Sequence, residues 1–161
     1  MKSLVLHYTS FKQNIELKTT FQVNKLYNTL TRDYGNYDDI LEYDIDKSNK
    51  VCISLKDLNA VCSVIDETFE EPPYRLELTF KNGASFTIDI WGEKRARNAY
   101  YLFLAQMKKP NLQHFYKIPQ TNKKHFSVIR IQDALQFVKL DEPKSDIQPL
   151  FEDRKWKLNQ I

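Results

Sequence analysis

The residues that could form a nucleophile with its base are three histidines, two cysteines and scattered serines. Nucleophilic catalysis needs a serine or cysteine beside a histidine and an acid, and a Gly-x-Ser-x-Gly turn would mark one such site. That turn is absent from the sequence, and His7, His114 and His125 lie far apart, each near a polar stretch. We therefore predict that the histidines are surface or interface residues and that the chain has no catalytic residue.

Metal-binding motifs are absent from the sequence as well. Cys52 and Cys62 are ten positions apart without a Cys-x-x-Cys partner, and no His-x-x-x-His occurs. Two such thiols are typical of small core residues in a reducing compartment. Asp44 and Asp46 would point to one face of a strand and could bind a hard cation, but a solvated acidic edge explains them equally well. We predict no metal and no cofactor.

Phosphate-binding and nuclease motifs are also weak. A phosphate-binding loop needs clustered glycines, and Gly35, Gly83 and Gly92 are isolated. The acid-x-Lys pair of many metal-dependent nucleases occurs at residues 16–18 and 153–155, but such triplets arise by chance among 21 acids and 24 bases. The first has no upstream acid and the second lies in a tail broken by prolines. The sequence therefore favours a non-enzymatic protein.

The net charge of +3 conceals an asymmetry between the two halves of the chain. Residues 1–90 contain 10 basic and 14 acidic side chains, whereas residues 91–161 contain 14 and 7. This distribution could mark an acidic lobe (1–90) and a basic lobe (91–161) within one domain. The two charged halves could steer a charged partner, or they could face each other.

The acidic half includes a segment, residues 33–46, that combines six carboxylates with three tyrosines and no base. Carboxylates spaced along one edge with tyrosines can bind a basic protein surface, including the nucleic-acid channel of a nuclease, where they would imitate phosphates. Because dedicated mimics are usually acidic overall and this chain is basic, mimicry would be local. The predicted partner-binding acidic patch comprises Asp38, Asp39, Glu42, Tyr43 and Asp44.

The basic half includes residues 94–124, which contain no acid and interleave lysines and arginines with aromatic residues. This combination can neutralise phosphates and stack on bases. No helix-turn-helix, zinc-finger or RNP signature indicates sequence-specific binding. A solvated basic face beside core tyrosines is the alternative explanation. The predicted basic patch comprises Lys94, Arg97, Tyr101, Lys108 and Lys109.

Hydrophobic periodicity predicts the elements that position these residues. Helical spacing predicts a helix over residues 21–34, capped by Thr20 and ended by Gly35, and a second over 93–107, stopped by Pro110. Asn82-Gly83 between alternating runs predicts a hairpin. An irregular basic segment is expected up to residue 124. Strands are predicted over residues 4–9, 14–18, 40–45, 51–55, 61–65, 74–80, 85–90, 126–131 and 135–140.

A chain of 161 residues with this pattern predicts a single α+β domain, a largely antiparallel sheet with two amphipathic helices packed on it. The order strand, Asp-led turn, strand, hairpin and helix over residues 51–107 resembles the latter half of small pleckstrin-homology-like modules found in bacteria. This resemblance covers about a third of the chain and rests on element order, without a family motif. It implies a binding or assembly role and transfers no functional residue.

These observations favour a non-enzymatic accessory protein that binds a larger protein. Lys, Asn, Ile, Tyr and Phe dominate, and only three glycines occur, which is typical of genes rich in A and T. We therefore expect a phage or mobile-element protein that inhibits or modulates a host protein or nucleoprotein, as anti-defence nuclease inhibitors do. The alternative is sequence-nonspecific nucleic-acid binding through residues 94–124. Because no apolar run reaches the roughly 18 residues of a membrane span, we expect the protein in the bacterial cytoplasm, without membrane contact.

Overall fold

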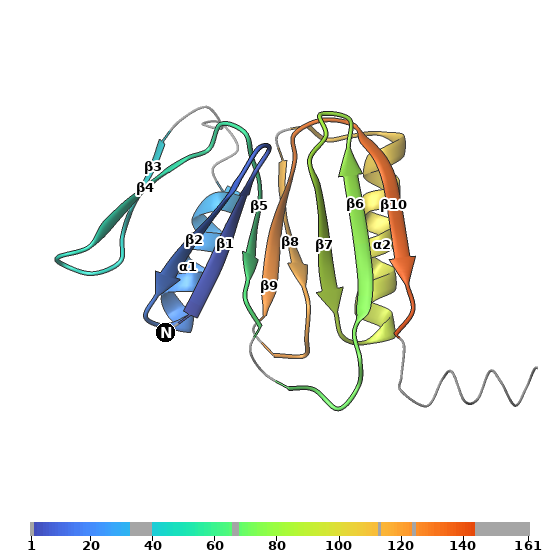
Figure 1. Cartoon of the computed structure of the whole chain (residues 1–161), viewed down its shortest axis with the longest axis horizontal. Helices are drawn as coiled ribbons and strands as arrows, with labels where there is room; N and C mark the ends of the chain where they lie inside the picture. Colours follow the sequence, from blue (N-terminus) through green and yellow to red (C-terminus); the bar gives the residue numbers. More distant parts are fainter. Residues whose placement is uncertain (1, 33–39, 66–67, 113, 124, 144–161) are drawn as a thin grey trace, which may run out of the picture.

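The computed structural model describes residues 2–32, 40–65, 68–112, 114–123 and 125–143, which form two helices and three antiparallel sheets (Figure 1). The α+β class predicted from the sequence is therefore confirmed. The elements are β1 (Lys2–Tyr8), β2 (Lys12–Leu17), α1 (Thr20–Arg32), β3 (Ile40–Asp44), β4 (Lys50–Ser54), β5 (Leu58–Ser63), β6 (Tyr74–Phe80), β7 (Ser85–Ile90), α2 (Glu93–Lys108), β8 (His114–Pro119), β9 (Phe126–Ile131) and β10 (Leu135–Asp141).

The strands are distributed over one large sheet, one small sheet and a ribbon. The large sheet has the order β2-β1-β5-β9-β8, the small sheet has the order β10-β6-β7, and among the described strands β3 and β4 pair only with each other. In the large sheet β5 pairs with β9, and in the small sheet β6 pairs with β10. Residues 1–90 and 91–161 therefore contribute strands to the same two sheets.

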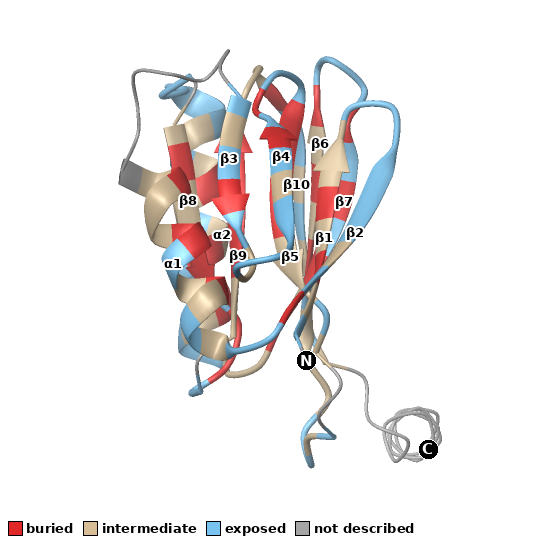
Figure 2. Ribbon diagram, turned by 90° about the vertical axis from the view of Figure 1, so that its left-hand side faces the viewer, coloured by how far each residue is buried: buried red, intermediate tan, exposed pale blue. Residues whose placement is uncertain are grey.

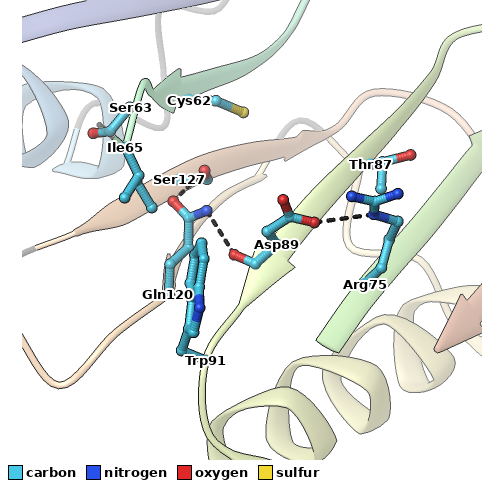
Figure 3. A pocket seen from close by; sticks show the side chains of 9 residues that line it. All are labelled: Cys62, Ser63, Ile65, Arg75, Thr87, Asp89, Trp91, Gln120 and Ser127. Carbon is cyan, nitrogen blue, oxygen red and sulfur yellow. Dashed lines mark hydrogen bonds and ion pairs between the residues drawn. The ribbon is translucent and has the colours of Figure 1, made fainter. Parts of the chain in front are cut away.

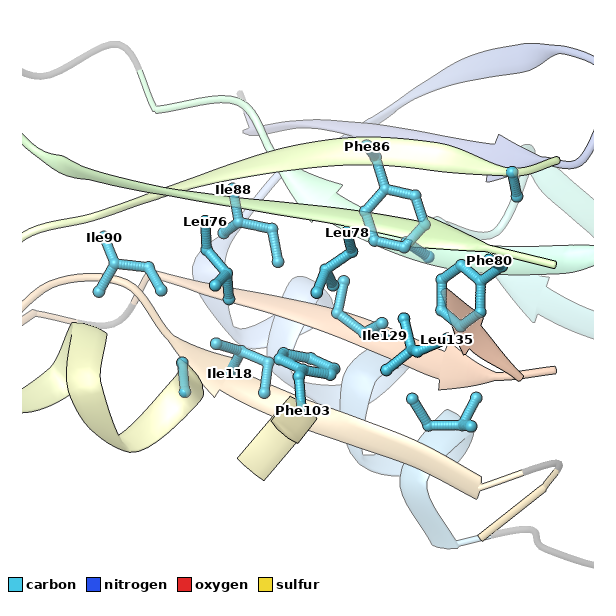
Figure 4. Packing of buried hydrophobic residues seen from close by; sticks show 14 of the residues in the cluster. Leu76, Leu78, Phe80, Phe86, Ile88, Ile90, Phe103, Ile118, Ile129 and Leu135 are labelled. Carbon is cyan, nitrogen blue, oxygen red and sulfur yellow. The ribbon is translucent and has the colours of Figure 1, made fainter. Parts of the chain in front are cut away.

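The central strands of the large sheet, β5 and β9, are buried on both faces, because alternate residues of a strand point to opposite sides. Ala60 and Ile129 pack towards the small sheet and α2. Val61 and Val128, their neighbours in the chain, pack towards α1 and the ribbon. Figure 4 shows Phe103 of α2 inserted between the two sheets, where its side chain is fully buried. The large sheet thus separates two hydrophobic cores.

Helix α1 begins at Thr20, one residue before its predicted start, and its cap is Thr19. The Thr19 hydroxyl accepts a hydrogen bond from the Gln22 N–H (3.2 Å), and the Gln22 side chain accepts one from the Thr19 N–H (3.3 Å). This is a capping box, which satisfies donors that a helix start leaves unpaired. The predicted cap at Thr20 is therefore wrong by one position, and the predicted end at Gly35 lies outside the described residues.

The predicted hairpin and second helix are confirmed. Strands β6 and β7 have the predicted bounds, and Gly83 in their turn has a φ of +94°, a backbone conformation that favours glycine. Helix α2 extends one residue beyond its predicted end. Its apolar stripe is buried at Ala96, Ala99 and Phe103.

One predicted irregular segment forms a strand instead. Residues 114–119 form β8, which pairs with β9 along its whole length. Because β8 lies in a basic stretch, the sequence pattern does not predict it as a strand. In the structure the charge is accommodated, since the Lys117 ammonium lies over the Phe126 ring, 4.3 Å from its centroid. Strand β5 begins three residues before the predicted start at position 61. The element order over residues 51–107 is present, but β4, β5 and the β6–β7 hairpin belong to three different sheets.

Candidate partner-binding groove and charged surfaces

A groove with a volume of about 520 Å³ runs between β4 and the β1–β2 hairpin, and we call it the β4 groove. Leu6 and Ile15 of the hairpin form an apolar floor, and the four consecutive β4 residues 51–54 form one wall. Lys56 and Asp57 line one end. The β4 groove therefore combines an uncharged centre with a charged end.

The ribbon is fixed against α1 by contacts of its inward-facing residues. The Tyr43 hydroxyl donates to the Gln22 carbonyl (2.7 Å), and the Gln22 side-chain amide donates to the Ile45 carbonyl. The Lys18 ammonium pairs with the Asp46 carboxylate at 2.7 Å, and this ion pair holds the pKa of Asp46 well below its usual range. These contacts set the distance between ribbon and hairpin, and with it the groove.

An aromatic pair borders the β4 groove at the turn between β1 and β2. The Phe11 ring stacks on the Tyr8 ring with centroids 4.6 Å apart, yet the Phe11 side chain is 56% exposed. The Tyr8 N–H donates to the Phe11 carbonyl (2.9 Å), and the Thr9 N–H donates to the Asp57 carbonyl (3.1 Å). A large exposed ring on a turn held by backbone bonds is typical of an interface anchor.

The structure separates the residues of the predicted acidic patch. Asp38 and Asp39 lie outside the described residues. Glu42 and Asp44 are exposed on the outer face of β3, whereas Tyr43, between them, is 7% exposed and belongs to the core. Figure 2, which views the ribbon side of the molecule, shows exposed and buried residues along β3. The ribbon thus presents two carboxylates outward and its tyrosine inward.

Most of the predicted basic patch does lie on one face. At about 100° per residue, Lys94, Arg97, Tyr101 and Lys108 form a single stripe along α2, and all four are exposed. Lys109 follows the end of the helix. We call Lys94, Arg97, Tyr101 and Lys108 the basic stripe. The carboxylates of Glu93 (3.0 Å) and Glu142 (3.9 Å) pair with the Arg97 guanidinium, so part of the positive charge is compensated.

A second hollow, of about 320 Å³, lies between the large and small sheets and is polar (Figure 3). We call it the inter-sheet pocket. The Gln120 side chain accepts a hydrogen bond from the Ser127 hydroxyl (2.8 Å) and donates one to the Asp89 carbonyl (2.8 Å). The Trp91 N–H donates to the Gln120 carbonyl (2.7 Å). The inter-sheet pocket is lined by Cys62, Ser63, Ile65, Arg75, Thr87, Asp89, Trp91, Gln120 and Ser127.

Several polar groups of the inter-sheet pocket are bonded to one another. The Arg75 guanidinium pairs with the Asp89 carboxylate at 3.1 Å, the largest cause of the raised Arg75 pKa. Burial raises the pKa of the Cys62 thiol to about 11, which makes it a poor nucleophile at neutral pH. The bonds of Gln120 join strands of the two sheets, so this pocket serves as a structural connection.

The three histidines contact different neighbours. The His7 ring on β1 lies 5.8 Å from the Phe86 ring, and the His114 ring lies 4.3 Å from the Tyr116 ring. Burial lowers the pKa of both, with the Lys12 charge adding to the shift of His7. The His125 ring nitrogen Nδ1 and the Thr121 hydroxyl share a hydrogen bond of 2.8 Å. Among the described residues, no group of three or more His, Cys, Asp or Glu is placed to hold a metal ion.

Sequence patterns alone missed the β4 groove. Its floor and wall come from segments about 40 positions apart, and Leu6 and Ile53 are also buried core residues, so their pattern does not distinguish a groove from the core. The only local signal is Phe11, a large apolar residue in a polar turn. In the part of the chain that the structure describes, no helix is both long and apolar enough to cross a membrane. No family model matches the chain, and neither a curated protein nor a solved structure is significantly similar to it.

Proposed function

We propose that this is a non-catalytic protein that binds a partner protein in the β4 groove. The observation that carries this proposal is an uncharged groove centre beside β4, which among the described strands pairs only with β3. Covering apolar surface of this kind with a partner removes it from water, which favours binding. A phosphate backbone would instead need clustered cations, and Lys56 in the groove is followed directly by Asp57.

The outer face of the ribbon supports the same proposal. Glu42 and Asp44 are exposed on β3, and in the ribbon register Glu42 lies opposite Cys52, which lines the groove. A partner seated in the groove would therefore reach these carboxylates. Charge at the rim of an interface raises the association rate and orients the partner, so a basic surface beside the bound segment fits this face.

A capture experiment with matched aromatic variants tests the proposal. Tagged protein is incubated with a nuclease-treated lysate of a low-GC bacterium, and retained proteins are identified by mass spectrometry. Phe11→Ser removes the exposed ring beside the groove, whereas Phe137→Ser removes a 45% exposed ring on β10. We expect at least tenfold less partner with Phe11→Ser and unchanged capture with Phe137→Ser. Equal capture by all three proteins would contradict the proposal.

The second candidate function is sequence-nonspecific nucleic-acid binding through the basic stripe. The observation that favours it is the alignment of Lys94, Tyr101 and Lys108 on one exposed face of α2. Fluorescence anisotropy with single-stranded and duplex DNA between 50 and 200 mM salt tests it. Binding through phosphates would weaken steeply with salt and disappear in Lys94→Glu/Lys108→Glu, while Lys25→Glu on α1 would leave it intact.

The origin and the partner's identity stay predictions from the sequence. A phage or mobile-element protein that inhibits a host nuclease would combine a small chain, no catalytic set and a partner with a basic surface. The capture experiment also tests this prediction, because the identified partner would be a nuclease or another defence protein.

A further inference from the structure

We propose that the partner inserts an extended segment into the β4 groove, where it pairs with the free edge of β4 as an added strand. This inference rests on the proposed function and specifies the chemistry of the bound segment. Strand addition supplies main-chain hydrogen bonds for affinity, and alternate side chains of the guest supply specificity.

The β4 groove follows the edge of the strand and not one of its faces. Successive side chains of a strand point to opposite faces, so a hollow on one face touches every second residue. All four consecutive residues 51–54 line the groove, and no residue of β3 does. The groove therefore lies on the side of β4 that faces away from β3, where no described strand pairs with it.

The register of the ribbon identifies the backbone groups on that edge. The Ile45 N–H donates to the Asn49 carbonyl (2.9 Å), and the antiparallel register continues from this pair to Tyr43–Val51 and Leu41–Ile53. Hydrogen-bonded and non-hydrogen-bonded pairs alternate in such a ladder. Val51 and Ile53 thus direct their N–H and C=O groups to β3, whereas Cys52 and Ser54 direct theirs to the free edge.

Side chains and charges specify the guest. One row of guest side chains would cover the apolar floor, so every second residue should be apolar. The wall residues 51–54 are uncharged, whereas Lys50, paired with Asp44 at 3.9 Å, and Lys56, beside Asp57, lie at its ends. The complementary segment is therefore uncharged where it faces β4 and carries its charges outside, because a charge over the apolar centre would lose hydration.

A selected peptide provides the probe for the first test. Linear ten-residue peptides are selected from a display library against the full-length protein, and the tightest binder is synthesised with one backbone N-methyl group at each position in turn. Strand addition predicts at least tenfold weaker binding at every second position and little change between them. Weaker binding after N-methylation at every third or fourth position, or at positions without any periodicity, would overturn the inference.

Hydrogen exchange and a matched pair of variants provide the second test. The peptide should slow amide exchange at Cys52 and Ser54. Cys52→Pro removes the N–H that faces the free edge and spares the bonds to β3, while Cys52→Ala removes only the thiol. Cys52→Ala, which keeps this N–H, is the reference for Cys52→Pro, and we expect the peptide to bind Cys52→Pro at least tenfold more weakly than Cys52→Ala, with circular dichroism confirming both folds.

The outcomes distinguish this inference from the proposed function. If Phe11→Ser weakens peptide binding while Cys52→Pro and the N-methyl scan have no effect, the groove binds its partner but strand addition is wrong. If Phe11→Ser has no effect either, the proposed function itself fails. Should Cys52→Pro prevent folding, the N-methyl scan decides alone. Self-association of the protein without peptide, seen by light scattering and lost on the same substitutions, would identify a second copy as the occupant and overturn the inference.

Discussion

The β4 groove and the inter-sheet pocket are both bordered by strands and both contain a cysteine, yet their polar groups are in opposite states. In the inter-sheet pocket, side chains such as Gln120 and Asp89 are bonded to groups of neighbouring strands. In the β4 groove the side chains at the centre are mostly apolar, and the backbone edge of β4 has no described neighbour. The polar residues of the inter-sheet pocket thus connect the two sheets, whereas the β4 groove offers an open strand edge, on which the proposed function depends.

The largest effect on stability is expected from Gln120→Ala. The Gln120 residue is 4% exposed, and its truncation leaves the Ser127 hydroxyl and the Asp89 carbonyl without this partner. Losing one buried and one partly buried hydrogen bond should lower the free energy of unfolding by about 2–4 kcal/mol. Urea denaturation measures this change, with Gln136→Ala, an exposed glutamine on β10, as the control. If the inter-sheet pocket were instead a binding site, Gln120→Ala would reduce partner capture and leave stability unchanged.

The two cysteines report directly on the difference between the two hollows. Raising the pKa of the Cys62 thiol from 9.0 to about 11 lowers its reactive thiolate about 100-fold at neutral pH. Cys52 is exposed on β4. Labelling with a disulfide reagent should therefore show one fast and one slow thiol, the slow one at least ~100-fold slower than free glutathione. Cys52→Ala should remove the fast phase and Cys62→Ala the slow phase, and two equal phases would contradict the contrast.

A smaller effect is expected where α1 holds the wall of the β4 groove. The Gln22 side chain accepts from the Lys18 and Thr19 N–H groups and donates to the Ile45 carbonyl. Gln22→Ala removes the side-chain half of the capping box and the link to the ribbon but keeps the bond from its backbone N–H to the Thr19 hydroxyl, and the loss should cost about 1–2 kcal/mol of unfolding free energy. Gln22→Glu keeps the capping acceptor and should recover part of this cost. Faster amide exchange confined to the ribbon of Gln22→Ala would show that the link holds the wall of the β4 groove. Equally faster exchange throughout the protein would mean that Gln22 contributes only by capping α1.

The sequence predicted those parts of the fold that depend on local signals. Asn82-Gly83 defines its hairpin because the turn needs a positive φ, which Gly83 supplies. The capping signal at Thr19 is equally local, since Gln22 follows it by three positions, but the adjacent Thr20 is a second residue of the same type, and the prediction at Thr20 is wrong by one position. Strand β8 is not predicted by the pattern because its lysine suggests an exposed segment, whereas the Lys117 ammonium lies over the Phe126 ring.

The candidate site depends on contacts between segments distant in the chain. Of the predicted acidic patch, the sequence identified two exposed carboxylates, Glu42 and Asp44, but it could not show that Tyr43 between them faces α1. Arg130 was counted as one of the surplus bases of the second half, yet it is 1% exposed and donates to the Leu55 carbonyl. Residue type fixes a charge, but only the packing of β3, β4 and α1 decides which charges and rings reach a partner.

The smallest predicted effect concerns the pH dependence of the ribbon. The Lys18 ammonium, the Asn49 side chain and the Ser48 and Asn49 backbone N–H groups bond to the Asp46 carboxylate and lower its pKa. Because the folded-state pKa is below the unfolded value of about 4, this stabilisation is present above pH 4 and is lost as the pH falls towards the folded-state pKa. Carbon NMR of the Asp46 carboxyl should therefore show no midpoint near pH 4, and the ribbon should stay in place there. Asp46→Asn should loosen the ribbon at neutral pH and abolish this dependence. A midpoint near pH 4 would mean that solvent, and not Lys18, surrounds the carboxylate, and that the wall of the β4 groove is held by Gln22 and Tyr43 alone.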